Sequence, residues 1–263
     1  LQPLVIYTIE VRQKEKMMRI LMVYPQFPDT FWSFKHALKF VNLKNNNPPL
    51  GLLTISAMLP RDWERKLVDM NIRHLKDADI RWADLVFISA MDVQRACVHE
   101  ILTRVKHYGK YIVAGGPLFT GEHEQFPLID TFVLNEGEIT FPQFLSDFSS
   151  GKKLNKIYET SEFADIQSSP LPDLSIINMK QYECMSIQVS RGCPFHCDFC
   201  NVTALLGHIP RIKTVEQIIA ELNQLYQAGW RHNVFVVDDN FIGNKKFLKD
   251  ELLPAMITWR QGK

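Results

Sequence analysis

The stretch Asp84-Leu85-Val86-Phe87-Ile88-Ser89-Ala90 is apolar almost throughout, which is typical of a buried strand covered on both faces. A long helical pattern over residues 92–108 follows it. The next apolar run, Tyr111 to Ala114, leads directly into Gly115-Gly116-Pro117. This strand–helix–strand spacing indicates βαβ units, and therefore a parallel sheet.

The same alternation extends in both directions from this stretch. Strands are predicted over residues 19–24, 66–70 and 131–134, and a helix over residues 50–59 between Pro48-Pro49 and Pro60. We predict an α/β fold with a doubly wound parallel sheet. Such sheets bind ligands at the carboxyl ends of their strands. The loops expected at that edge are Ser89–Met91, Gly115–Pro117 and Asn135–Glu138.

The chain changes character after residue 150. The segment from Ser168 to Asp173 is rich in Pro and Ser, which indicates a connector between domains. Strands are expected again over residues 185–189 and 233–237, and helices over 214–227 and 245–259, with Thr214 and Gln217 as a capping box. We predict an unassigned lead (residues 1–17), a first domain (18–150), a connector (151–182) and a second domain (183–263).

Composition excludes several classes of protein. The 263 residues include 30 Lys and Arg against 29 Asp and Glu, so no global basic field exists to attract nucleic acid. The apolar runs are shorter than the roughly 18 residues that a membrane helix needs, and the N-terminus lacks the basic start of a signal peptide. Five cysteines are too few, and odd in number, for a secreted disulfide framework. We expect a cytoplasmic protein.

Three of these cysteines crowd into one short loop. Cys193, Cys197 and Cys200 follow the strand 185–189 in the segment Arg191 to Asn201, which Gly and Pro punctuate. Thiolates are the ligands that iron–sulfur clusters prefer. Three thiolates on a [4Fe–4S] cube leave one iron open, and an open metal position is where chemistry occurs.

A structural zinc site is the main alternative. It would need a fourth ligand, for which the candidates are His196, Cys184 and Cys97. His196 lies between two of the three cysteines and Cys184 starts the preceding strand, so neither is well placed to complete a tetrahedron. Cys97 lies in the helix 92–108 and is expected to be a small buried hydrophobe.

The spacing Cys193-x3-Cys197-x2-Cys200, with an aromatic residue before the last cysteine, resembles the signature loop of the radical S-adenosylmethionine (SAM) superfamily. The resemblance implies that the three cysteines hold a [4Fe–4S] cluster and that SAM chelates its open iron. The implied cofactor contacts on this side are Phe199, Asn201, Asp238, Asp239 and Asn240. For the two acids, the alternative is that they cap a helix and are otherwise solvated.

A doubly wound domain directly before such a loop resembles the cobalamin-binding domain of B12-dependent radical SAM enzymes. The segment Pro48 to Leu52 and the three loops at the sheet edge lie where that family has its motifs. Taken alone, Gly115-Gly116 would indicate only a tight turn. The implied cobalamin contacts are Ser89, Met91, Gly115, Gly116, Pro117, Glu136, Gly137 and Glu138.

The chain departs from methionine-synthase-like domains in one respect. The motif Asp-x-His-x-x-Gly, which supplies an axial histidine there, is absent, and only Pro25 to Asp29 follows the first strand. His36 comes later, in a helical run, and is expected at the surface. The resemblance therefore implies cobalamin bound without a histidine axial ligand.

Within the family, the segments Phe27–Phe34, Arg191–Phe195 and Asn201–Ala204 look closest to the subgroup that contains hopanoid C-2 methylases. This implies methyl transfer to an unactivated carbon through a 5′-deoxyadenosyl radical and methylcobalamin. The implied partners are a small-molecule or lipid substrate and an electron donor such as flavodoxin or ferredoxin. Peripheral contact with a membrane fits a lipid substrate, and no nucleic-acid partner is expected.

Other hypotheses keep part of this interpretation. The chain could catalyse a radical rearrangement or oxidation, or be a cofactor-binding fragment without turnover. A methylthiotransferase acting on tRNA would need three further cluster cysteines in the first domain, which has only Cys97. Finally, a six-unit barrel needs about 180 residues, and only 79 residues extend from Met185 to Lys263. We therefore expect the N-terminal portion of a longer enzyme.

Overall fold

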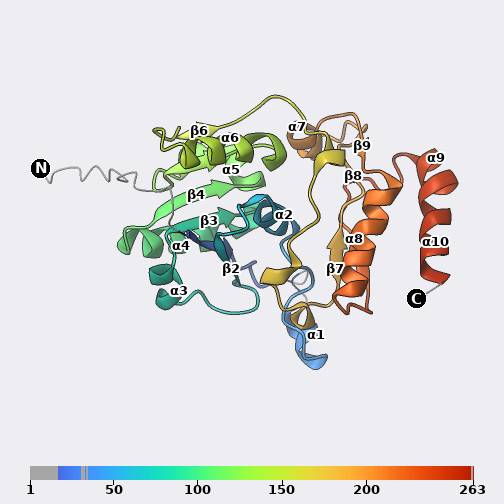
Figure 1. The fold of residues 1–263 in the computed structure, drawn as a ribbon, viewed down its shortest axis with the longest axis horizontal. Helices are drawn as coiled ribbons and strands as arrows, with labels where there is room; N and C mark the ends of the chain where they lie inside the picture. Colours follow the sequence, from blue (N-terminus) through green and yellow to red (C-terminus); the bar gives the residue numbers. More distant parts are fainter. Residues whose placement is uncertain (1–16, 31–32, 34, 262) are drawn as a thin grey trace, which may run out of the picture.

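The computed structural model describes residues 17–30, 33, 35–261 and 263, coloured along the chain in Figure 1. Residues 1–16 of the predicted lead lie outside the described residues. So do Phe31, Trp32 and Phe34 of the segment used to choose the subgroup. No helix in the described part of the chain is long and apolar enough to span a bilayer.

The first domain is built on a six-stranded parallel sheet with the strand order β2-β1-β3-β4-β5-β6. Its strands are β1 (Arg19–Tyr24), β2 (Glu64–Asp69), β3 (Leu85–Ser89), β4 (Tyr111–Gly115), β5 (Thr131–Val133) and β6 (Ile157–Tyr158). Strand β1 pairs with both β2 and β3, so the chain order reverses there. The predicted α/β fold with a doubly wound parallel sheet is confirmed.

Helices cover both faces of this sheet, which explains why its strands are apolar throughout. The helices of the first domain are α1 (Lys35–Phe40), α2 (Leu50–Met58), α3 (Asp77–Trp82), α4 (Arg95–His107), α5 (Pro117–Glu122) and α6 (Gly137–Ser149), with 3-10 turns at Asp92–Gln94 and His123–Gln125. Leu21 and Val23 face the layer formed by α3, α4 and α5, whereas Ile20 and Met22 face α2 and α6. Alternate residues of one strand thus enter two different cores.

The connector is fastened to the first domain. Its strand β6 pairs with β5, so the sheet takes an edge strand from residues that the sequence placed in the connector. Further along, the Ser56 hydroxyl donates to Asp173 at 2.7 Å, and the Gln181 carbonyl accepts from two amides of the loop before α2. The connector also contains 3-10 turns at Ile166–Ser168, Leu174–Ile176 and Met179–Gln181. The domain boundaries near residues 150 and 182 stay predictions.

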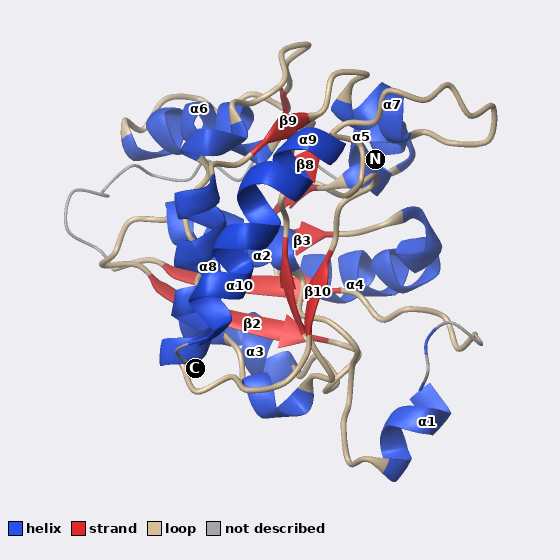
Figure 2. Cartoon of the chain, turned by 90° about the vertical axis from the view of Figure 1, so that its right-hand side faces the viewer, coloured by secondary structure: helices blue, strands red, loops and turns tan. Residues whose placement is uncertain are grey.

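The second domain lies beside the carboxyl ends of the first sheet, with α2 near the junction (Figure 1). It contains β7 (Met185–Ile187), β8 (Ser190–Arg191), α7 (Val202–Leu206), β9 (Arg211–Ile212), α8 (Val215–Gln227), β10 (Val234–Val236), α9 (Lys245–Phe247), a π-helical segment (Leu248–Leu252) and α10 (Leu253–Gln261). Strands β7 and β10 are parallel neighbours, and Figure 2 shows them with α8 and α10 nearby.

Local signals in the second domain are confirmed in part. Thr214 and Gln217 form the predicted capping box, with the Gln217 amide donating to the Thr214 hydroxyl at 3.2 Å. The single helix expected over residues 245–259 instead passes through the π-helical segment before α10 begins. Strands β8 and β9 pair antiparallel and form a short ribbon on either side of the three cysteines.

Candidate functional site

Two adjoining cavities lie between the carboxyl edge of the first sheet and the second domain. The smaller cavity has a volume of about 370 Å³ and the larger cavity about 780 Å³. Their shared wall residues come from the start of α2, the end of β3, the start of α5 and the segment after β10: Leu50, Gly51, Leu52, Ser89, Pro117 and Val237. Volumes of this order are typical of small-ligand and cofactor sites.

The structure brings the predicted cobalamin-side residues together around these cavities. The smaller cavity is lined by Ser89, Gly115, Gly116, Pro117, Glu136, Gly137 and Glu138. Met91 lines the larger cavity and is 47% exposed. Three loops that are distant in sequence thus converge because the ends of parallel strands meet at one edge.

The turn after β4 requires glycine at position 116, whether or not a ligand is bound. Gly116 has φ of +98°, and a Cβ atom there would lie 2.7 Å from the Ser89 hydroxyl oxygen. Only glycine adopts this conformation without strain. The tight-turn interpretation therefore holds for Gly116, and the same turn places it on the cavity wall.

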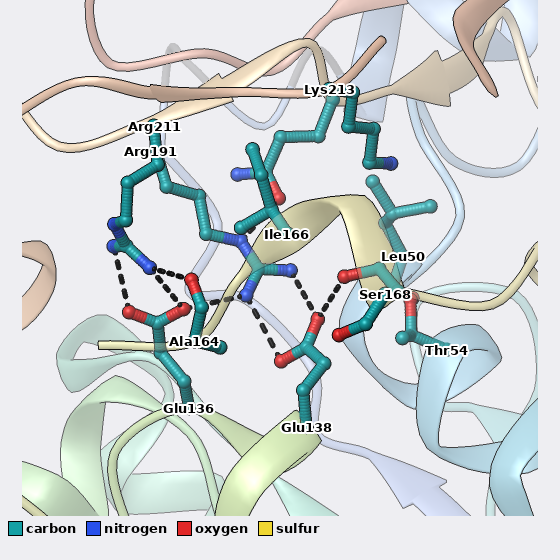
Figure 3. Close-up of polar contacts among 12 residues, drawn as sticks. Leu50, Thr54, Glu136, Glu138, Ala164, Ile166, Ser168, Arg191, Arg211 and Lys213 are labelled. Atoms are coloured by element: carbon teal, nitrogen blue, oxygen red, sulfur yellow. Dashed lines mark hydrogen bonds and ion pairs between the residues drawn. The ribbon is translucent and has the colours of Figure 1, made fainter. Parts of the chain in front are cut away.

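Four charged side chains join the two domains at the edge of the smaller cavity (Figure 3). Arg191 of β8 binds Glu138 through both terminal nitrogens, at 2.7 and 3.0 Å, and also binds Glu136 at 3.0 Å. Arg211 of β9 binds both oxygens of Glu136, at 2.7 and 2.8 Å. We call these four residues the Glu–Arg network. The pair Arg191–Glu138 has the bidentate geometry in which Arg–carboxylate contacts are strongest, whereas Arg211 makes one hydrogen bond and one ion-pair contact with Glu136.

The network is buried, which strengthens its electrostatics. The side chains of Glu136, Glu138, Arg191 and Arg211 are 3%, 7%, 14% and 18% exposed. Burial alone would raise the pKa of Glu138, but the paired Arg191 guanidinium lowers it to about 2. Burial likewise opposes the charge of Arg191, yet the two carboxylates leave its pKa above the usual value. Both acids also lie at the N-terminus of α6, where the helix dipole favours negative charge.

This arrangement bears on two predicted contacts. Glu136 and Glu138 were expected to meet a cofactor, and both instead bind arginines of the second domain. They still line the smaller cavity. A cofactor contact for either carboxylate stays a prediction.

The three cysteines lie in the excursion between β8 and β9. In that ribbon, Arg191 and Arg211 are directly opposite each other. Gly192 has φ of +93°, and a Cβ atom there would lie 2.8 Å from the Ile209 carbonyl oxygen. The Cys193 amide donates to the Gly207 carbonyl at 3.1 Å. The backbone therefore closes the loop tightly at its base.

All three thiols are free, and Cys197 is exposed whereas Cys193 and Cys200 are half-buried. Free thiols in a closed loop are a donor set that suits an iron–sulfur cluster. In the described residues, no three or more His, Cys, Asp or Glu side chains are gathered closely enough to hold a metal ion. Ligation by the three cysteines therefore stays a prediction, as do contacts by Phe199, which is 93% exposed, and Asn201, which precedes α7.

The predicted acids follow β10 and lie near the base of the cysteine loop. Asp238 accepts from the Val189 amide at 2.7 Å and from the Ser190 hydroxyl at 2.6 Å. Burial raises its pKa, against the effect of these hydrogen bonds, and burial together with Asp238 raises the pKa of Asp239. The amide nitrogen of Asn240 lies 3.9 Å from Cys193 Sγ.

The alternative interpretation of these acids as helix caps is wrong. The next helix, α9, begins at Lys245, and its N-cap is Asn244, whose side chain accepts from the Phe247 amide. Asp238 instead fastens the ends of β7 and β8. Contact of Asp238, Asp239 and Asn240 with SAM stays a prediction.

Sequence reasoning missed part of the cavity wall. Asn45, Asn46 and Asn47 line the larger cavity, although they were not predicted to contact a ligand. Asn45 donates at 3.0 Å to the buried carboxylate of Asp69, which also accepts from the Tyr182 hydroxyl at 3.1 Å. A run of three amides directly before two prolines was the available signal. The two arginines of the Glu–Arg network were also missed as functional residues.

Comparisons with known proteins agree with this geometry. Residues 39–145 match the model of the B12-binding domain family. An uncharacterized methyltransferase of Synechocystis sp. is 43% identical over 93% of this chain and 46% of its own length. The hopanoid C-2 methylase of Rhodopseudomonas palustris is 35% identical over 92% of this chain and 47% of its own length. The chain thus spans about half the length of the curated relatives that it matches.

A solved structure shares the fold. The cobalamin-dependent SAM radical enzyme OxsB, with aqua-cobalamin and SAM bound, matches 92% of this chain and 37% of its own, with a TM-score of 0.71 and 18% identity. The sheet edge and the three loops at it lie in the part of the chain that matches the B12-binding domain family, and the cysteine loop lies in the part beyond it. Over nearly its whole length the chain is thus similar to methyltransferases, and residues 39–145 belong to a B12-binding domain.

Proposed function

We propose that this chain is the cofactor-binding part of a B12-dependent radical SAM methyltransferase acting on an unactivated carbon. One observation carries the proposal. The smaller cavity at the carboxyl edge of the first sheet has a second wall formed by Gln188, Arg191 and Val237, close to the cysteine loop. A ligand in it would lie between the cobalamin motifs and the three thiols. When bound, the [4Fe–4S] cluster with SAM supplies a 5′-deoxyadenosyl radical and methylcobalamin supplies the methyl group.

Cobalamin would be held by the loops after β3 and β4 and by the exposed side of α2. These elements offer apolar surface and backbone groups, with few charges apart from the Glu–Arg network. Among the described residues that line either cavity, none is histidine. We propose that the corrin binds without a histidine axial ligand, since the sequence lacks the motif Asp-x-His-x-x-Gly.

The cluster would be held by Cys193, Cys197 and Cys200, which are free and share one loop. SAM would lie between this loop and the segment after β10. There, Asn240 lies beside Cys193 and the side chain of Asp239 is exposed. Asp238 would act indirectly, because its two oxygens already hold the ends of β7 and β8.

The substrate and partners are further parts of the proposal. The 35% identity to a hopanoid C-2 methylase supports a small-molecule or lipid substrate of the hopanoid type, with peripheral membrane contact. The electron that reduces the cluster would come from a donor such as flavodoxin or ferredoxin. A cytoplasmic location fits three free thiols, which persist in a reducing compartment.

Anaerobic reconstitution of the full-length protein tests this proposal. We expect separate absorption bands for cluster and cobalamin, release of 5′-deoxyadenosine from SAM, and a product heavier than the substrate by one CH2 unit. The Cys197→Ser variant should lose the cluster bands and 5′-deoxyadenosine but keep the cobalamin bands. A loaded cluster without cobalamin bands, or a product of unchanged mass, would refute the methyltransferase assignment.

A further inference from the structure

The ribbon of β8 and β9 carries the cysteine loop but is a weak structure by itself. Each strand has two residues, and isolated two-stranded hairpins are marginally stable in water. Backbone support comes from the Lys213 amide, which donates to the Val189 carbonyl at 2.9 Å. The orientation of the loop relative to the first domain therefore needs further contacts.

The Glu–Arg network supplies those contacts. The two arginines are cross-strand partners, and both reach the N-terminus of α6 (Figure 3). Both arginines also make further hydrogen bonds. Arg191 Nε donates to Gln188 at 2.7 Å, and Arg211 donates to the carbonyls of Ala164 and Leu206 at 2.6 and 2.8 Å. The orientation of the planar Arg191 guanidinium is thus fixed by hydrogen bonds on several sides, in addition to its ion pairs.

The same segment of α6 faces the smaller cavity. Glu136, Gly137 and Glu138 line it, and so does Arg191 from the opposite domain. A ligand that presses on this wall meets the residues that hold the ribbon. The contact is direct, because one carboxylate, Glu136, binds both arginines.

We propose that Arg191 and Arg211 are positioning residues, which set the cysteine loop against the smaller cavity and transmit occupancy of that cavity to the loop through Glu136 and Glu138. The transmission rests on the proposed cobalamin site, whereas the anchoring of the ribbon does not. Neither arginine is assigned to the chemistry. Each acts through the placement of the loop.

Hydrogen–deuterium exchange of the full-length protein, with and without hydroxocobalamin, tests both parts. In the wild type we expect slow exchange over residues 190–212 and further protection when hydroxocobalamin binds. In Glu138→Gln, exchange over this segment should be about tenfold faster without ligand, because a hydrogen-bonded charge pair is lost. At a hydroxocobalamin concentration at which absorption shows the site to be filled, the ligand should no longer protect residues 190–212.

Arg191→Lys is a second variant, in which the charge stays but the bidentate geometry is lost, and we expect an intermediate effect. Glu122→Gln is the matched control, since Glu122 pairs with Arg95 at 2.7 Å within the first domain. It should leave exchange over residues 190–212 unchanged. Unchanged exchange in Glu138→Gln, or ligand protection of the segment equal to wild type, overturns the inference. A wild type that binds no hydroxocobalamin refutes the proposed function and the transmission, while the ligand-free comparison still decides the anchoring.

Discussion

Replacing Glu138 by glutamine should lower the free energy of unfolding most at neutral pH and least in acid. The paired Arg191 lowers the pKa of Glu138 to about 2, against an ordinary value of 4.5. The unfolded chain therefore binds the proton more readily between these two values. The stability due to ionised Glu138 is fully present above pH 4.5 and is lost as the pH falls toward 2.

The magnitude follows from the two pKa values. A separation of about 2.5 units corresponds to about 3 kcal/mol at pH 7 and to about 1 kcal/mol at pH 3. Because glutamine resembles the protonated acid, the difference between wild type and Glu138→Gln should follow the same curve. Burial raises the pKa values of Asp69, Asp238 and Asp239, but these groups are present in both proteins and cancel in the difference.

Urea unfolding of both proteins at pH 7, 5 and 3 measures this difference. Glu122→Gln is again the control, since its ion pair is partly exposed and should contribute less than about 1 kcal/mol. A difference for Glu138→Gln below about 1 kcal/mol at pH 7, or one that grows as the pH falls, would show that the Glu–Arg network does not depress this pKa.

Three further substitutions test other parts of the structure. Gly192→Ala should destabilise the base of the cysteine loop by about 1–2 kcal/mol, because φ is positive there. Iron content after reconstitution should fall while cobalamin absorption stays, and equal iron loading would contradict this. Tyr182→Phe removes a hydrogen bond to buried Asp69 and should cost about 1–3 kcal/mol in urea unfolding. Phe144→Ala leaves a cavity between α6 and the sheet and should cost about 3–5 kcal/mol; a loss below 1 kcal/mol would show that the site collapses freely.

The sheet of the first domain was predictable because both of its faces are buried. Strands such as β1 and β3 read as unbroken apolar runs, and the helices between them give the βαβ spacing. Strand β6 was not predictable, since Ile157 and Tyr158 are too few to show a period. The π-helical segment before α10 likewise has no local signature in a sequence that favours helix throughout.

The candidate site divides in the same way. The cysteine loop was visible because its chemistry lies within eight consecutive residues, from Cys193 to Cys200. The Glu–Arg network was not, because its pairs are separated by 53 to 75 positions along the chain. The spacing of residues in a sequence indicates which side chains are neighbours within one helix, strand or loop. Contacts between domains depend on how these elements pack, which the spacing does not show.

The connector has a consequence for how the two domains unfold. The connector is part of the first domain's framework, because it supplies strand β6, binds Ser56 and accepts hydrogen bonds from the loop before α2. The hydroxyl of Ser169 also donates to Glu138 at 2.7 Å, which joins the connector to the Glu–Arg network. A segment held at so many points opens only when its neighbours do. We expect proteases to cut it slowly under native conditions and the two domains to melt in a single cooperative transition.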